Sequence, residues 1–247
     1  MKQQILKVGG LMCLATFFSC STDNENVQST NETEINSPIA KSTTQNYIVT
    51  AHQMADNFDY QNFVFEDKSI QAFISNYDLP MKELATEQFM DDLFAGKEFV
   101  DRNGLKAFFL SKGFTSYTAD VMVNFEQNID ISGIVNTPSF QNLPDLDKVM
   151  LQSVIDLQAD LFAYEANSTS SYNTSNYSSV YMMSAYGGDP RRNTWMAIGA
   201  GIGSIAGGLI GGIPSGGIGY LPGAAIGSII GGVVGYASGI VADVVSP

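Results

Sequence analysis

The sequence has little of the chemistry that enzymes and metal sites need. Its 247 residues include two cysteines and one histidine. The histidine, His52, has no cysteine and no carboxylate at ligand spacing, so it forms neither a metal site nor a catalytic triad. Asp91 and Asp92 are adjacent and would point about 100° apart on a helix, which excludes a paired acid and base. We therefore expect no enzyme activity, no cofactor and no metal.

Positive charge is also scarce. The chain has 12 Lys and Arg against 25 Asp and Glu, a formal net charge of −13. Nucleic-acid binding needs a basic face, so this function is excluded, and anionic lipid headgroups would be repelled. Between Asn46 and Glu165 there are 19 acidic and 7 basic residues. This excess predicts a solvated surface, and a face for cations or a basic partner is the alternative.

The N-terminus has the order of a secretory signal. In "MKQQILKVGGLMCLATFFSC" two lysines precede an apolar run from Val8 to Phe18, which is too short to span a bilayer well. The segment resembles a bacterial lipoprotein signal peptide covering residues 1–19. This resemblance implies cleavage after Ser19 and lipidation of Cys20. Cys13 is the competing site, but Met12 is a poor residue before a cut, and an ordinary signal remains the alternative.

A polar, acidic segment follows, and we expect residues 20–44 to form a disordered tether. Asp23 and Glu25 resemble, across an interrupting asparagine, the early acidic signal by which Bacteroidota lipoproteins reach the outer face of the outer membrane. The resemblance implies a lipid-anchored, surface-exposed protein of the cell envelope. With Cys20 lipidated and Cys13 removed, no thiol would be left for a disulfide.

The middle of the chain has a helical period. In "PMKELATEQFMDDLFAGKEFV", apolar residues recur near every 3.6 positions, and Gly96 is a candidate helix stop. Gly113 is a second stop. A longer stripe comprises Leu146, Val149, Met150, Val154, Leu157, Leu161 and Phe162. We expect five or six helices over residues 45–166, packed as one small bundle. Residues 167–193 are rich in Ser, Asn and Tyr, and this composition predicts a disordered linker. The alternative is that the tyrosines form a surface on which sugars stack.

The tail, residues 194–247, has a repeat of small residues. Every fourth position from residue 199 to residue 239 is glycine, except a serine at 215. The glycines are Gly199, Gly203, Gly207, Gly211, Gly219, Gly223, Gly227, Gly231, Gly235 and Gly239. Branched apolar residues occupy two other rows. A helix keeps the small and branched rows on separate faces, whereas a strand would mix them, so we expect helices whose glycine faces pack closely.

The environment of these helices is predicted from the cost of glycine. In water each glycine lowers the stability of a helix by roughly 1 kcal/mol relative to alanine, so we expect no isolated helix there. In hydrocarbon the backbone must satisfy its own hydrogen bonds, which favours a helix. Pro214 and Pro222 divide the tail into two segments of 19 residues, each ~28 Å long as a helix and close to a bilayer's ~30 Å hydrocarbon core. Trp195 and Tyr220 are placed as interface aromatics, with Arg191, Arg192 and Asp243 as polar flanks.

The expected fold is therefore all-α: a small helical bundle and a C-terminal glycine-rich hydrophobic helical hairpin, joined by a disordered linker. The tail resembles a glycine zipper, and resembles in this segment only the glycine-zipper bacteriocins and contact-dependent inhibition proteins. Three functions follow. The hairpin inserts into a target membrane and self-associates, as a bacteriocin-like pore former. Alternatively it anchors or oligomerises an envelope protein, or it packs on the bundle of a surface binding module. The expected partners are membrane lipid and further copies of the chain, and a protein partner is left unspecified.

Overall fold

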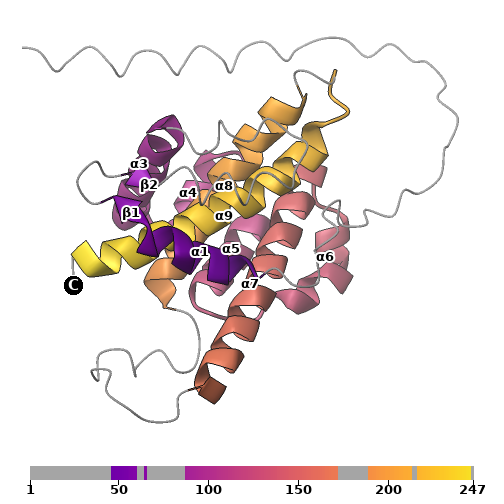
Figure 1. Cartoon of the computed structure of the whole chain (residues 1–247). Helices are drawn as coiled ribbons and strands as arrows, with labels where there is room; N and C mark the ends of the chain where they lie inside the picture. Colours follow the sequence, from indigo (N-terminus) through magenta and orange to yellow (C-terminus); the bar gives the residue numbers. More distant parts are fainter. Residues whose placement is uncertain (1–45, 60–63, 66–86, 172–188, 213–215, 246–247) are drawn as a thin grey trace, which may run out of the picture. The chain divides into compact units, whose positions relative to one another are not determined.

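Helices form nearly all of the regular structure in the described part of the computed structural model (Figure 1). The structure describes residues 46–59, 64–65, 87–171, 189–212 and 216–245. All of them belong to one unit, residues 37–247. The prediction of an all-α protein is confirmed. The signal peptide, Cys20 and the tether lie outside the described residues.

The elements follow one another in a simple order. The first part comprises α1 Tyr47–Asp56, β1 Phe58–Asp59, β2 Val64–Phe65, α3 Glu87–Asn103, α4 Leu105–Ser111 and α5 Ser116–Glu126. The second part comprises the 3₁₀ helix η2 Ser132–Asn136, α6 Pro138–Gln141, α7 Asp145–Ser171, α8 Pro190–Gly212 and α9 Tyr220–Val245. The two short strands pair antiparallel, with Phe58 opposite Phe65.

The two C-terminal helices form a hairpin that the other helices surround. In Figure 1, α8 (orange) and α9 (yellow) run side by side along their length. Helices α1 and α7 pack on α9, and α3, α4, α5 and α7 pack on α8. We call α1, α3, α4, α5 and α7 the shell. The predicted hairpin is confirmed, and its apolar residues share one core with those of the shell.

The shell is held together by buried polar groups of α7. Asp147 is 3% exposed and accepts hydrogen bonds from the Thr115 amide (3.0 Å) and the Thr118 hydroxyl (2.6 Å) at the start of α5. Asp160 accepts one from the Tyr47 amide (2.9 Å) at the start of α1. The Gln158 carboxamide accepts a hydrogen bond from the Ile131 amide (2.9 Å) and donates one to the Ile129 carbonyl (2.9 Å), both in the segment between α5 and η2. Buried carboxylates are stable where donors surround them, so these contacts fix α1 and α5 on α7.

One detail of the predicted bundle is wrong. Gly96 does not end a helix, since α3 continues to Asn103. It is a close-approach site: a Cβ atom there would lie 2.8 Å from Ile198 Cγ2 of α8, so only glycine lets the two helices meet at this distance. Phe94 recurs with Phe89 and Leu93 in the helical period of the segment, but it is 47% exposed whereas those two residues are buried. Its ring covers the edge of Trp195, with centroids 5.5 Å apart.

The helices extend into the segment expected to be a linker. Helix α7 continues to Ser171 and α8 begins at Pro190, while residues 172–188 lie outside the described residues. The start of α8 has a local cause. The Asp189 carboxylate accepts a hydrogen bond from the Arg191 amide (2.9 Å), and Pro190 occupies the first helical position, where its missing amide costs nothing.

Candidate functional site: the glycine hairpin

The glycine rows of α8 and α9 face each other within one chain. The facing pairs are Gly199 with Gly231, Gly203 with Gly227, Gly207 with Gly223, and Gly211 with Gly219. In each pair a Cβ atom on one glycine would press directly on the carbonyl oxygen of the other. A Cβ on Gly203 would also lie 3.1 Å from Gly231 Cα. The two main chains are therefore in direct contact along the hairpin, as small-residue rows permit.

The row continues to the open end of the hairpin, which we call the base. A Cβ on Gly235 would lie 3.2 Å from Met196 Cα, and one on Gly239 would lie 3.0 Å from Arg192 Cα. All ten glycines singled out in the sequence thus lie at the contact between α8 and α9. In this arrangement they are occupied within the chain. Pairing of the same row with a second copy requires α8 and α9 to separate.

The remaining faces of the hairpin receive side chains of the shell. Gly201 lies under the ring of Phe109, with 2.9 Å between a Cβ placed on the glycine and Phe109 Cε1. Gly232 contacts Leu157 of α7 in the same way. Branched residues fill the space between these contacts, and Ile198, Ile230 and Val233 are fully buried. Sequence reasoning missed Gly96 and Gly201 because neither falls in the four-residue row.

Both hairpin helices are long and apolar enough to cross a membrane. With 23 and 26 residues they extend about 35 and 39 Å, against a hydrocarbon core of about 30 Å. The core helices of a water-soluble protein can have the same length and composition, and most of each hairpin helix is buried here. Trp195, placed at a membrane interface by its position in the sequence, is 6% exposed and lies under α3.

The base of the hairpin is closed by charged and aromatic groups. Arg192 Nε donates to Asp243 Oδ2 at 2.7 Å, joining the start of α8 to the end of α9. His52 of α1 stacks on Tyr164 of α7 at 4.8 Å and meets the ring of Tyr236 of α9 edge-on at 6.0 Å. Four helices thus meet at one cluster. Between Arg192 and Asp243 the chain has no charged side chain.

Burial of the His52 ring, reinforced by the positive charge of Arg192, lowers the pKa of this histidine, and Asp56 opposes the shift weakly. The unfolded chain therefore binds more protons below the ordinary histidine pKa of about 6.5, and folding stability falls as the pH drops through that value toward the folded pKa.

We expect His52→Phe, which keeps a ring against Tyr164 but cannot titrate, to lose less stability than the wild type between pH 7.5 and pH 5. Urea unfolding followed by circular dichroism at both pH values measures the difference, in which the carboxylates common to both proteins cancel. Parallel pH profiles for the two proteins would contradict the assigned role of the buried ring.

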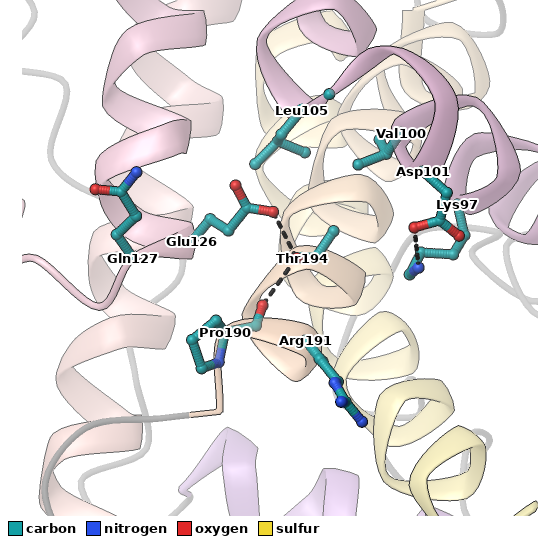
Figure 2. Close-up of a pocket in the computed structure, with 10 residues that line it drawn as sticks. Lys97, Val100, Asp101, Leu105, Glu126, Gln127, Pro190, Arg191 and Thr194 are labelled. Carbon is teal, nitrogen blue, oxygen red and sulfur yellow. Dashed lines mark hydrogen bonds and ion pairs between the residues drawn. The ribbon is translucent and has the colours of Figure 1, made fainter. Parts of the chain in front are cut away.

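A shallow cavity of about 490 Å³ lies beside the start of α8 (Figure 2). Its lining residues are Lys97, Val100, Asp101, Gly104, Leu105, Glu126, Gln127, Pro190, Arg191 and Thr194. Three of its charged side chains have partners: Lys97 pairs with Asp101 at 2.5 Å, and Glu126 Oε1 accepts a hydrogen bond from the Thr194 hydroxyl at 2.6 Å. The cavity holds no histidine or cysteine. No cluster of three metal-ligating side chains occurs in the described ranges.

The structure thus concentrates its unusual features in the hairpin: main-chain contact along ten glycines, an uncharged stretch of membrane-spanning length, and a base closed by one ion pair. Comparison of the chain with protein-family models, with curated proteins and with solved structures finds no match.

Proposed function

We propose that this chain is a non-enzymatic envelope lipoprotein that stores a membrane-inserting hairpin inside a helical shell and releases it into a lipid bilayer. The observation that carries the proposal is the division of contacts in the hairpin. The glycine faces of α8 and α9 contact each other, whereas their branched faces contact the shell. The lipid anchor at Cys20 and display on the outer membrane belong to the same proposal.

This division lets the hairpin move as one unit. On insertion the close contact of α8 with α9 is kept, and the main-chain hydrogen bonds remain satisfied within each helix, as hydrocarbon requires. Only the contacts with the shell, such as those of Ile198 and Val233, are exchanged for contacts with lipid tails. Because lipid and a protein core are both apolar, this exchange is nearly balanced for the hairpin.

The absence of charge favours the same route. A charged side chain at the bilayer centre costs at least ~2.5 kcal/mol, and the hairpin has none between its base residues. Arg191, Arg192 and Asp243 all lie at the base, so both helix ends can remain in water on one side. Pore formation would follow if several inserted hairpins associate in the target membrane, in the manner of a bacteriocin.

A second candidate is a surface binding module, in which the hairpin serves only as the core. It is favoured by the burial of α9: Ala224, Ser228, Ile230 and Val233 are completely inaccessible to solvent. In that case the acidic shell would face a partner and the glycines would serve helix packing alone. An anchor in the protein's own envelope is intermediate, with insertion but no permeation.

We expect the full chain to release a self-quenched dye from phosphatidylcholine vesicles, with a release rate that rises more steeply than linearly with protein concentration. The steep dependence arises because several hairpins must meet to form one pore. Fluorescence dequenching measures release, and flotation of the vesicles measures binding. Flotation without release would indicate an anchor, and a chain that neither floats nor releases dye would favour the binding module.

A further inference from the structure

The closed end of the hairpin exposes large apolar side chains. Ile218 is 88% exposed and Leu209 is 53% exposed, whereas Ile198 and Ile230, in the middle of the hairpin, are fully buried. Val244 at the open end is 60% exposed, but it directly follows the charged Asp243. Ile218 is the most exposed of the large hydrophobic residues that the structure describes. We call Leu209 and Ile218 the tip. In Figure 1 this end of the hairpin is opposite to the C-terminal end of α9.

The turn holds the tip in place by hydrogen bonds. Gly216 and Gly217 have φ values of 63° and 100°, which side chains other than glycine rarely adopt. The Gly217 amide donates to the Gly212 carbonyl at 2.8 Å, and the Tyr220 amide donates to the Gly217 carbonyl at 3.2 Å. Ile218 follows Gly217 and lies within the turn that the second of these bonds closes. Its exposure is therefore a feature of a hydrogen-bonded turn.

The composition of the tip selects its partner. Neither tip residue carries a charge, and along the chain the nearest charges are Arg192 and Asp243 at the other end of the hairpin. The start of α7 packs beside the start of α9 through Leu146 and Val149, and its charged residues Asp145 and Lys148 pair with each other at 3.7 Å. A protein surface with charged groups would find no charge on the two tip residues themselves. A second copy of the chain is also a poor fit, because a stable protein interface buries roughly 800 Å² per partner and two side chains supply far less. A bilayer needs only apolar groups that leave water.

We propose that the tip is a docking surface for a neutral lipid bilayer, through which the folded chain first enters the membrane. Neutral lipid is specified because the chain has a net charge of −13 and would be repelled by an anionic surface. The inference rests on the proposed function, since it assigns the first contact of the same hairpin. It adds that docking uses residues already exposed, so the shell need not open for binding.

The test is flotation of the full chain with phosphatidylcholine vesicles. We expect Ile218→Asp to lower the partition coefficient about tenfold or more, because a fully exposed isoleucine gains the transfer free energy of its side chain only on entering lipid. The matched control is Ile129→Asp, which changes an isoleucine that is 48% exposed and lies between α5 and η2. This variant should stay within twofold of the wild type.

Equal loss in Ile218→Asp and Ile129→Asp, or no loss in either, would overturn the docking surface, even if the wild type released dye as the proposed function requires. A wild type that does not float would overturn both. Size-exclusion chromatography without lipid identifies the remaining possibility. A wild-type dimer that becomes a monomer in Ile218→Asp would mean that the tip contacts a second copy, contrary to our inference.

Discussion

Replacing Gly203 with alanine should destabilise the fold by about 2 kcal/mol or more, although alanine is the better helix former by ~1 kcal/mol. The added Cβ would press on the Gly227 carbonyl oxygen and lie 2.8 Å from the Gly227 carbonyl carbon. Both are main-chain atoms of a packed helix, so no side-chain rotation relieves the contact. Overpacking of this kind typically costs 1–3 kcal/mol and more where the backbone must move. Urea unfolding of the full chain measures the change.

The control is Gly133→Ala in η2. A Cβ there would have no atom within 4 Å, and the φ of Gly133 is not positive. We expect this variant to unfold within ~0.5 kcal/mol of the wild type, as surface substitutions usually do. If Gly203→Ala were as stable as the wild type, the two helices could not be in main-chain contact. The facing residue Gly227 offers a second position with the same expectation.

The glycine repeat predicted the hairpin from sequence because its period has a geometric meaning. Glycine at every fourth position places one smooth face on a helix, and Pro214 with the glycines after it marks a turn. The period does not say which row meets which. A row such as Gly203 and Gly207 can pack on another copy as well as on Gly223 and Gly227, and in the structure of the single chain it packs on the latter.

The sequence offered burial of the hairpin against the bundle only as one of three alternatives, because the cost of glycine was compared between water and lipid alone and a protein interior was left out. Glycine-rich helices are costly when isolated in water and are compelled in lipid, but a protein interior also removes water and supplies packing. An apolar helix is therefore consistent with a position in lipid and with a position in a protein core. The features that distinguish a protein core lie off the main row: Gly96 admits Ile198, and Gly201 admits Phe109. Their spacing in the sequence is irregular because each matches a different shell helix.

A disulfide between α3 and α8 should keep the hairpin in the shell and block dye release. A Cβ on Gly96 would lie 2.8 Å from Ile198 Cγ2, so the Cβ atoms of residues 96 and 198 would be at most about 4.3 Å apart, within the ~3.5–4.5 Å of disulfides. Gly96→Cys with Ile198→Cys therefore fits a staple. The full chain would carry Cys13→Ser and Cys20→Ser in every sample, so that no other thiol competes.

We expect the oxidised double variant to release dye from phosphatidylcholine vesicles at least tenfold more slowly than the same protein after reduction. Insertion of the stapled α8 would carry α3 toward the hydrocarbon, together with the exposed carboxylates of Asp91, Glu98 and Asp101. At ~3 kcal/mol for each charge, the three carboxylates together would cost about 9 kcal/mol, which is comparable to the whole stability of a typical fold. Ile198→Cys alone, which leaves Gly96 in place, serves as the control and should be insensitive to oxidation.

Docking and insertion should separate in this stapled protein. Because the tip is exposed while the shell is closed, the oxidised form should still float with vesicles, and adding Ile218→Asp should abolish that binding. Reduction should restore release without changing the initial binding. Equal release rates before and after reduction would mean that α8 need not leave α3, and permeation by the hairpin would then be wrong. Loss of flotation on oxidation would instead show that the shell must open before the membrane is bound.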